Sequence, residues 1–529
     1  MQAPLLLRTE GWAGRGVGLA LGALAVLGQA PFHIWPITLL SLACLFGRLQ
    51  WAAEAAHSGR RGFSAAIWWA LGYFAAGTFW VGSAFVERGP EFIPIMPFMV
   101  AGLAALLALF WGLAGAIFAR AKLSGFWAVL VFTASFTVAE LTRGHIFGGF
   151  PWNLPAYIFE AGTRPSQIAR WIGAYGLSAL VLMVSAALGQ ALFWREKRWP
   201  VALAILPLLG LYGIGHLRLS GAILEYHADV NLRIVSVPFK QSDMMEINSS
   251  VAVTNDFIIA SIKPGIEDVT HLVWPEGAVR GFRGPAMDDP DLLNAVGGLL
   301  ANEDSEPPVW LMNSLQTEME RGRTRYYNVS VAITFDANGV PTVAGTNRKR
   351  KLVAFGEHIP FMDWFEDVQF PLISTNLASI SPAKEKRLSD FPGLPRLSPQ
   401  LCYEVAFPGL TPNGAGRPAE FILNQSNDAW FGKSAGPAQH ANTARYRAIE
   451  TGLPIIRAAS NGMSGQIDPY GRVHGEVVEV DINFIDTKLL KPLIFNDNIK
   501  FLDLALLLIS LLICVITPLV RLRGVGLRA

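Results

Sequence analysis

Long apolar runs separated by short polar connections fill the first 216 residues of the chain. A helix needs roughly 17 to 25 apolar residues to cross the hydrocarbon core of a bilayer. Seven runs meet or approach this length, at 11–28, 36–49, 63–85, 93–118, 125–141, 172–194 and 200–216, and an eighth covers 501–520. The second run is the weakest, because Pro31 and Pro36 interrupt it. Further runs follow the first one directly, so we expect it to remain in the protein as a span.

Between the seventh and eighth runs, the pattern changes to short strand-like segments that alternate with helical stretches. The strand-like segments are 232–237, 271–274, 309–311, 329–335, 340–345 and 420–424, and the helices are predicted near 244–262, 289–302 and 439–451. Asn338-Gly339 between two of the strands favours a tight hairpin turn. About 280 residues suffice to bury a separate core. The pattern therefore predicts a membrane bundle at 1–218, an α/β sandwich domain at 219–500, and a last span with a basic tail at 501–529.

Composition and charge support a membrane protein with a defined orientation. Hydrophobic residues make up 52% of the chain and charged residues 16%, and the net charge of +2 forms no extended basic patch. This distribution argues against a nucleic-acid partner. Basic residues in short connections stay in the cytoplasm, and here they flank alternate connections: Arg8, Arg15, Arg48, Arg60, Arg61, Arg120, Lys122, Arg195, Lys197, Arg198 and the tail arginines 521, 523 and 528. Seven spans then place 219–500 on the outer face of the membrane.

Cysteine usage singles out one residue of the predicted domain. The chain has three cysteines, and Cys44 and Cys514 lie in predicted spans, which leaves Cys402 for the domain. A reduced thiol outside the cytoplasm is exposed to oxidation, which favours a chemical role. The alternative is a buried cysteine that packs as a small hydrophobic residue.

Two further residues have settings that suit acid and base chemistry. Glu276 closes the strand-like segment 271–276, where α/β folds present catalytic groups, although a solvated loop acid would fit as well. Lys349 belongs to a basic run, 348–351, that would ordinarily face water or lipid headgroups. Together with Cys402 they fit one mechanism: Glu276 takes the thiol proton, and Lys349 stabilises the thiolate and the oxyanion. The backbone N–H after Cys402 is a second candidate oxyanion donor. A Cys–His arrangement with His271, His358 or His440 remains open.

The same residues resemble a known pattern. Trp274-Pro-Glu276, Lys349 eight residues before Glu357, and Cys402-Tyr-Glu404 are similar to the Glu-Lys-Cys triad of the nitrilase superfamily. Three further motifs resemble the apolipoprotein N-acyltransferase family: Gly148-Gly-Phe-Pro-Trp-Asn153, Ser426-Asn-Asp-Ala-Trp-Phe-Gly432, and Gly436-Pro-Ala-Gln-His440 with Arg445 and Arg447. The resemblance covers nearly the whole chain. It implies about eight spans and an αββα nitrilase-like domain in the bacterial cytoplasmic membrane, with the domain on the periplasmic face.

The resemblance also implies roles for individual residues. Glu276 would be the general base, Lys349 the oxyanion stabiliser and Cys402 the nucleophile, because the interval to Glu357 selects Lys349 over Lys351. The residues expected to support them are Glu357, Tyr403 and Glu404, and the candidates for substrate binding are Met245, Trp430 and Phe431.

The implied reaction moves a fatty acyl chain between two lipid-anchored substrates without a metal or other cofactor. A membrane phospholipid, phosphatidylethanolamine in our expectation, would be the donor, and the N-terminal amine of diacylglyceryl-cysteine in an apolipoprotein the acceptor. The apolar segment 361–372 is a candidate lid. A membrane-tethered amidase that uses water as acceptor is the alternative enzyme. A transporter or receptor with an inactive domain is the nonenzymatic alternative, disfavoured by the intact triad and by the few charges in the spans.

Departures from the family pattern lie near the predicted site. A Lys-Trp pair is common after the first domain strand, but this chain has Lys240-Gln241 and then Met244-Met245. Ala354 replaces a usual proline, and Gln425 stands where isoleucine or a similar residue is common. We expect these differences to affect lipid preference or catalytic efficiency more than the fold.

Overall fold

The computed structural model describes residues 9–194, 199–279, 286–301, 306–320, 323–353, 356–357, 380–384, 388–412, 417–477, 483–493 and 499–522. The chain divides into two compact units. The helical unit comprises Met1–Ala222, Ser434–Glu450 and Asn498–Ala529, and the α/β unit comprises Ile223–Lys433 and Thr451–Asp497. Nearly all of helix α12 (Gly436–Thr451) therefore belongs to the helical unit, although its sequence lies inside the predicted domain.

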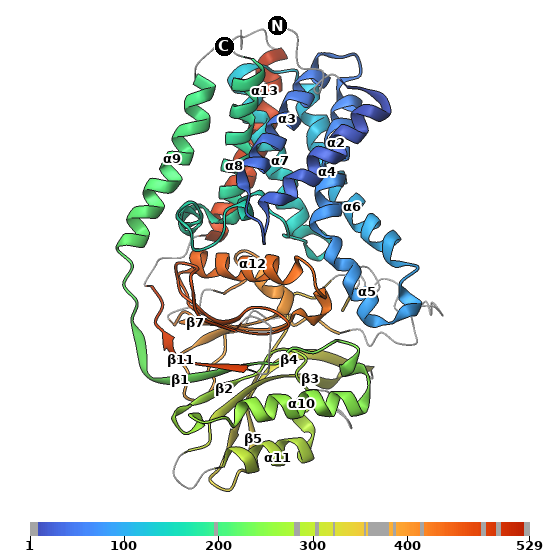
Figure 1. Ribbon diagram of the computed structural model, residues 1–529. Coiled ribbons are helices and arrows are strands. Elements are labelled where there is room, and N and C mark those ends of the chain that lie inside the picture. Colours follow the sequence, from blue (N-terminus) through green and yellow to red (C-terminus); the bar gives the residue numbers. More distant parts are fainter. Residues whose placement is uncertain are drawn as a thin grey trace. The chain divides into compact units, whose positions relative to one another are not determined.

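Apolar helices build the helical unit (Figure 1). They are α2 (Gly11–Ala25), α3 (Trp35–Glu54), α4 (Ser58–Gly77), α5 (Ser83–Arg88), α6 (Met96–Ala121), α7 (Gly125–His145), α8 (Ala169–Phe193), α9 (Trp199–Ser220) and α13 (Ile499–Leu522). Among the described residues, six helices are long and apolar enough to cross a membrane, and a bent pair would make a seventh. The apolar stretch of α13 within that search, Asp503–Thr517, is shorter than these. The number of spans is therefore approximate.

Two of the predicted spans differ from the helices observed. The run at 63–85 is not one straight helix, because α4 ends at Gly77 and the chain continues as Phe79–Arg88 after a 55° bend. Thr78 lies at the bend and donates its hydroxyl to the carbonyl of Phe74. The weak run at 36–49 is a full helix of 20 residues, since Pro36 occupies the first turn, where its missing N–H costs no hydrogen bond.

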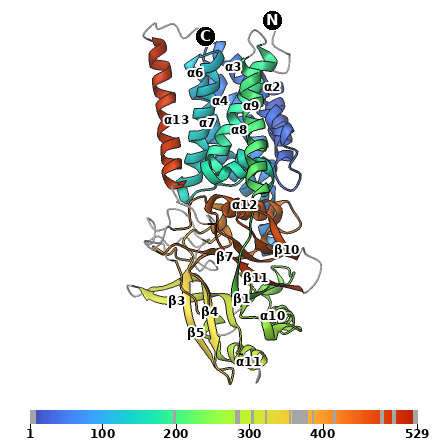
Figure 2. The same cartoon turned by 90° about the vertical axis from the view of Figure 1, so that its left-hand side faces the viewer.

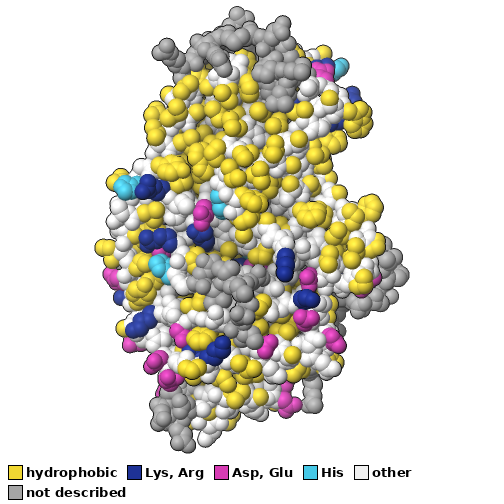
Figure 3. All heavy atoms as spheres, in the orientation of Figure 1, with side chains coloured by type: hydrophobic (Ala, Val, Ile, Leu, Met, Phe, Trp, Pro, Cys, Tyr) yellow, Lys and Arg dark blue, Asp and Glu magenta, His cyan; other side chains and the backbone are white. Residues whose placement is uncertain are grey.

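Aromatic side chains fill the interior of the helical unit, and aliphatic side chains cover its outside. Trp69 on α4 and Trp111 on α6 stack with their ring centroids 4.9 Å apart, and both are buried. Leu113 and Leu206 point outward and are mostly exposed. Helix α13 packs along α7 and α8 (Figure 2). The visible surface of this unit is almost continuously hydrophobic, whereas charged side chains are scattered over the α/β unit (Figure 3). Such a surface suits contact with lipid.

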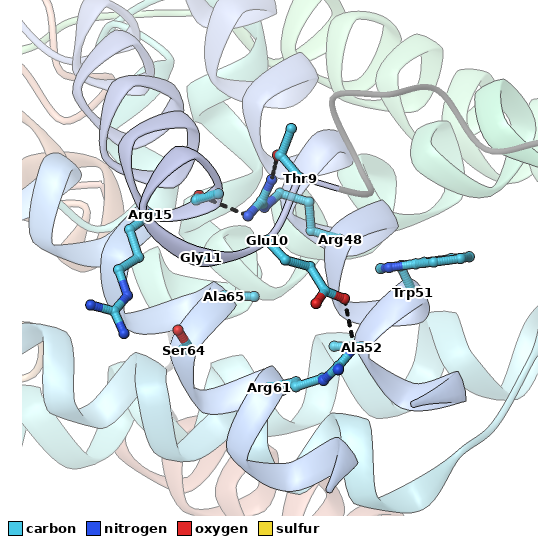
Figure 4. Close-up of a pocket in the computed structure, with 11 residues that line it drawn as sticks. Thr9, Glu10, Gly11, Arg15, Arg48, Trp51, Ala52, Arg61, Ser64 and Ala65 are labelled. Carbon is cyan, nitrogen blue, oxygen red and sulfur yellow. Dashed lines mark hydrogen bonds and ion pairs between the residues drawn. The ribbon is translucent and has the colours of Figure 1, made fainter. Parts of the chain in front are cut away.

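A pocket at one end of the helical unit is lined in part by Arg15, Arg48 and Arg61, three of the basic residues predicted to face the cytoplasm (Figure 4). Arg48 is buried and donates to the hydroxyl of Thr9 at 3.0 Å and to the carbonyl of Gly14 at 2.8 Å. Arg61 pairs with Glu10 at 2.6 Å. These contacts tie the start of α2 to α3 and α4.

Two facing β-sheets form the α/β unit. The first has the order β11-β1-β2-β3-β4-β5 and the second β10-β9-β8-β7-β6. The strands are β1 (Tyr226–Ser236), β2 (His271–Val273), β3 (Val309–Glu320), β4 (Arg323–Phe335), β5 (Pro341–Arg348), β6 (Leu397–Leu401), β7 (Phe421–Asn427), β8 (Ile455–Ser460), β9 (Ser464–Ile467), β10 (Val473–Val477) and β11 (Asn483–Leu490). Strands β1 to β3 run parallel, as do β6 to β8.

Two layers of apolar side chains hold this unit together. One layer lies between the sheets and joins residues such as Ile234 and Leu311 to Leu423 and Ile456. The other joins the first sheet to helices α10 (Ile247–Ser261) and α11 (Pro290–Leu300). The hairpin predicted at Asn338-Gly339 is confirmed, since β4 and β5 pair antiparallel and Gly339 has a φ of +77°. The layered α/β sandwich predicted from the sequence is thus the observed fold.

Candidate active site

The three predicted catalytic residues each follow the carboxyl end of a strand. Lys349 directly follows β5, and Cys402 directly follows β6. Glu276 comes three residues after the end of β2. Gly277, the next residue, has a φ of +77°, and a Cβ atom there would lie 2.6 Å from the side-chain Nδ2 of Asn427. Glycine therefore lets the chain turn at Glu276 without backbone strain.

Lys349 is the centre of an ion cluster. Its Nζ lies 2.7 Å from Oε1 of Glu357 and 3.3 Å from Oε1 of Glu276, and its side chain is 1% exposed. Burial lowers the pKa of Lys349, but the carboxylates of Glu276 and Glu357 outweigh burial and hold this pKa above its ordinary value. Lys349 is therefore a fixed ammonium at neutral pH.

Asn328 and Asn427 orient the carboxylate of Glu276, and Asn328 was not identified from the sequence. Asn328 donates its amide to Oε1 of Glu276 at 2.7 Å, and the backbone N–H of Asn427 donates to Oε2 at 3.3 Å. Asn313 holds Asn328 in turn, with 2.6 Å between its Nδ2 and Oδ1 of Asn328. Asn313 and Asn328 lie inside β3 and β4, so the sequence offered no turn or motif to reveal them.

The backbone of Cys402 has the left-handed conformation, with a φ of +49°. Such a φ is uncommon for a residue other than glycine and recurs at functional sites. Burial raises the pKa of the Cys402 thiol, and the charge of Glu276 adds to this, while Lys349 opposes it. The resting thiol is therefore neutral, and a base is needed to form the thiolate.

Glu404 ties the lysine segment to the cysteine segment. Its Oε1 accepts the backbone N–H groups of Arg350 at 2.8 Å and Lys351 at 3.1 Å, and its Oε2 accepts that of Leu401 at 2.8 Å. Burial raises the pKa of Glu404, although Arg350 and these N–H groups act in the opposite direction. Glu404 thus fixes the position of Lys349 relative to Cys402 through the backbone.

Both parts of the chain match family models. Residues 21–187 match the apolipoprotein N-acyltransferase N-terminal domain, and residues 309–479 match the carbon-nitrogen hydrolase family. An apolipoprotein N-acyltransferase of Caulobacter vibrioides is 34% identical over 487 residues, which cover 88% of this chain and 86% of that protein. The chain belongs to the apolipoprotein N-acyltransferase family. A second member, from Rhodopseudomonas palustris, is 32% identical over 492 residues, with 88% of each chain covered.

Among solved structures, an amidase of the nitrilase superfamily from Nesterenkonia is similar to this chain with a TM-score of 0.34 and 15% sequence identity. The similarity covers 51% of this chain and 93% of the amidase.

Two motifs that resemble this acyltransferase family meet in the helical unit. The indole Nε1 of Trp152, from the motif at 148–153, donates to Oε1 of Gln439 on α12 at 2.7 Å. Trp80 donates to the same oxygen at 3.1 Å. Arg143 on α7 donates to the carbonyls of Phe150 and Trp152 and so holds the loop that carries Trp152. Trp152 and Gln439 are 287 residues apart in the sequence, and the fold joins them.

The remaining candidate residues of this acyltransferase family member differ in how far they are buried. Tyr403 is buried with its ring edge against Phe407, and Phe431 is also buried. Met245 is 43% exposed, and Trp430 is partly exposed. Substrate binding by Met245, Trp430 and Phe431 stays a prediction. The candidate lid at 361–372 and Ala354 lie outside the described residues.

The histidines proposed as alternative bases have other surroundings. His271 is buried, with Nε2 bonded to the carbonyl of Pro392 at 2.9 Å and Nδ1 to the hydroxyl of Thr270 at 2.8 Å. His440 belongs to α12, where its ring packs on Trp152. His358 lies outside the described residues. Among the described residues, Glu276, Lys349 and Asp428 exert the main charge effects on the pKa of the Cys402 thiol.

Proposed function

We propose that this chain transfers a fatty acyl group from a membrane phospholipid, through a thioester on Cys402, to the N-terminal amine of diacylglyceryl-cysteine in apolipoproteins. The observation that carries the proposal is the buried ammonium of Lys349 between Glu276 and Glu357, with Cys402 within its electrostatic reach, in a member of this family. Glu276, Lys349 and Cys402 are the proposed catalytic residues. Glu357, Tyr403 and Glu404 are proposed to support them.

In the first step, Glu276 takes the thiol proton and Sγ of Cys402 attacks the ester carbonyl of the phospholipid. Lys349 and the backbone N–H of Tyr403 stabilise the oxyanion that forms on this carbonyl. The bond between the carbonyl carbon and the ester oxygen then breaks. Glu276 returns its proton to the departing oxygen, which leaves a lysophospholipid and an acyl thioester.

In the second step, the amine of the lipoprotein cysteine attacks the thioester. An N–C bond forms, the C–S bond breaks, and the proton released by the amine returns to the cysteine sulfur through Glu276. The enzyme is regenerated without a cofactor. Both substrates are anchored in lipid, which suits an enzyme that carries membrane-length apolar helices. We place the catalytic domain on the periplasmic face of the inner membrane, since the short basic connections favour the cytoplasmic side.

The test uses purified protein, a phospholipid labelled in its acyl chain, and a diacylated lipopeptide. Label on the peptide amine is expected, whereas label found as fatty acid alone would identify a hydrolase and refute the transfer. Cys402→Ala is expected to form no acyl-enzyme on a gel. Cys514→Ala, which changes a cysteine of α13, is the matched control and should retain it. An acyl-enzyme that persists in Cys402→Ala would disprove the nucleophile.

A further inference from the structure

Two asparagines on adjacent strands connect Glu276 to the first sheet. Asn313 on β3 pairs in register with Ser330 on β4, and Asn328 lies two residues before Ser330, so the side chains of both asparagines project from the same face of the sheet. Nδ2 of Asn313 lies 2.6 Å from Oδ1 of Asn328, and Nδ2 of Asn328 lies 2.7 Å from Oε1 of Glu276. Asn328 and Glu276 are buried. Two carboxamides in series therefore end on the proposed base.

Backbone groups fix which way the carboxamide of Asn313 faces. The carbonyl of Val329 can only accept a hydrogen bond, and Nδ2 of Asn313 lies 3.0 Å from it. The N–H of Gly277 can only donate, and Oδ1 of Asn313 lies 3.4 Å from it, which is a long contact. A reversed carboxamide would place its oxygen against the carbonyl of Val329 and its amino group against the N–H of Gly277. The nitrogen of Asn313 is therefore the donor in its contacts with Val329 and Asn328.

The direction of the Asn313 carboxamide determines that of Asn328. One hydrogen on Nδ2 of Asn313 goes to the carbonyl of Val329, and the other is left for Asn328. The atom of Asn328 that receives this hydrogen must be an acceptor, which is the carbonyl oxygen of its side chain. The amino group of Asn328 then faces Oε1 of Glu276. In the reverse orientation, the oxygen of Asn328 would face a carboxylate oxygen, and the two acceptors would repel each other.

We propose that Asn313 is a positioning residue, which holds the carboxamide of Asn328 with its donor toward Glu276 and so keeps the Glu276 carboxylate in place for proton transfer. This inference rests on the proposed role of Glu276 as the general base that acts on Cys402. Asn313 touches neither the thiol nor a substrate in this mechanism. Its whole effect on the reaction is expected to pass through Asn328.

The two oxygens of Glu276 differ in their contacts. Oε1 accepts from Nδ2 of Asn328 at 2.7 Å and from Nζ of Lys349 at 3.3 Å. Among the residues that the structure describes, Oε2 has one donor, the backbone N–H of Asn427 at 3.3 Å. A carboxylate oxygen has two lone pairs, so both are occupied on Oε1 and one remains on Oε2. Oε2 is therefore the oxygen to which the thiol proton moves.

Acylation of Cys402 by a soluble ester tests the role of Asn313 without phospholipid or lipopeptide. The full-length protein in detergent is mixed with p-nitrophenyl butyrate at neutral pH, and the burst of p-nitrophenolate gives the acylation rate. The amplitude of the burst counts the folded sites, and Cys402→Ala gives the background. Asn328→Ala should slow the burst on the order of 10²-fold. Asn313→Ala should slow it about five- to tenfold, because it loosens the donor without removing it.

A double-mutant cycle shows whether Asn313 acts through Asn328. In the Asn328→Ala background, Asn313→Ala should cause no further loss of rate, because the carboxamide that Asn313 orients is absent. A purely structural role of Asn313 would instead add its own loss to that of Asn328→Ala. Asn231→Ala removes another carboxamide on a strand, one that donates to the carbonyl of Asp268, and should leave the rate unchanged in both backgrounds.

Asn313→Asp tests the direction of the two carboxamides. Aspartate keeps the size of asparagine but is only an acceptor at neutral pH, so it should draw the amino group of Asn328 away from Glu276. This variant should therefore be slower than Asn313→Ala, which is the reverse of what packing alone predicts. In the Asn328→Ala background the difference should vanish, whereas a direct effect of the new charge on Glu276 would persist there.

The outcomes separate this inference from the proposed function. The inference alone is overturned by additive losses in Asn313→Ala and Asn328→Ala, by an Asn313→Asp protein at least as fast as Asn313→Ala, or by a difference between these two that persists in the Asn328→Ala background. A Cys402-dependent burst with the expected coupling, in a protein that moves no label from phospholipid to lipopeptide, would refute the proposed transfer alone. A wild-type protein without a burst would refute both.

Discussion

Lys349 and Glu357 form the shortest contact of the ion cluster, with 2.7 Å between Nζ and Oε1, although eight residues separate them in the chain. The second oxygen of Glu357 accepts the backbone N–H of Val353 at 2.9 Å. The Glu357 carboxylate thus balances the charge of the Lys349 ammonium and also fixes the backbone turn that follows Lys349. Glu276, which lies farther from Nζ at 3.3 Å, remains available for proton transfer in the proposed mechanism.

Replacing Glu357 by glutamine should therefore slow acyl-enzyme formation. Glutamine keeps the size of the side chain but removes the charge that fixes Lys349. Misplacement of an oxyanion-stabilising group costs on the order of 10²-fold in rate, and we expect a loss of that size. Single-turnover labelling with a radioactive phospholipid measures it. Glu267→Gln changes an exposed acid and is the control. If both variants acylate at the wild-type rate, Glu357 has no supporting role.

Lys349→Met and Lys351→Met should differ in stability and in pH dependence. Because the pKa of Lys349 is raised by its carboxylate partners, its stabilising contribution is fully present below about pH 10.4 and is lost only as the pH rises through the folded value. Lys349→Met leaves Glu276 and Glu357 facing each other without a buried cation, at a cost of about 3 kcal/mol. The deficit should persist up to about pH 10.4 and shrink only at higher pH, where wild-type Lys349 also begins to lose its stabilising charge.

Thermal unfolding at several pH values checks that expectation. Lys351 is partly exposed and lies over the ring of Phe407, so Lys351→Met should change stability little at any pH. It should also retain acyl-enzyme formation, which Lys349→Met should lose. Equal effects of the two substitutions would contradict the assignment of Lys349 as the oxyanion stabiliser.

The sequence placed only Glu276 at the end of a strand, because the strand-like segment 271–276 closes on it. Lys349 and Cys402 were chosen for their chemistry, and the structure puts them directly after β5 and β6. The layered α/β fold and most of the apolar helices follow from the same periodicity. The choice of Lys349 over Lys351 as the catalytic lysine came from the family resemblance alone.

Amides and bends escaped prediction for a physical reason. The side chain of Asn328 acts on Glu276 from a strand far away in sequence, and a carboxamide inside a strand has no periodic signature. The bend after Gly77 likewise interrupts a run that stays apolar on both sides. Gln425 was noted only as a departure from the family pattern. The structure shows its carboxamide donating to the carbonyls of Trp274 and Leu311 and accepting from Ser330.

Gln425→Ile should therefore destabilise this protein, even though isoleucine suits the family pattern. Gln425 is fully buried and links β7 to three strand positions of the other sheet, with 2.8 Å to the carbonyl of Trp274 and 2.6 Å to the hydroxyl of Ser330. Loss of the amide leaves these buried groups without their partner, at about 2 to 3 kcal/mol. A lower melting temperature is the expected readout.

A double variant separates lost hydrogen bonds from poor packing. Ser330→Ala in the Gln425→Ile background removes one of the orphaned polar groups, so part of the stability should return. Gln425→Glu is less suitable, since it would bury a charge. A Gln425→Ile protein as stable as wild type would show that the carboxamide contributes nothing to the contact between the sheets.

Gln439→Leu should weaken the attachment of α12 within the helical unit. Oε1 of Gln439 accepts the indole N–H groups of Trp80 and Trp152, whose rings lie 4.8 Å apart, and Gln439 is buried. Leucine fills the space but removes the acceptor, which should cost about 2 kcal/mol and lower the melting temperature of the purified protein. The fluorescence of the two tryptophans reports the same change locally, compared with a Trp171→Phe control on an exposed position of α8. Unaltered stability in Gln439→Leu would mean that the shared acceptor does not anchor the helix.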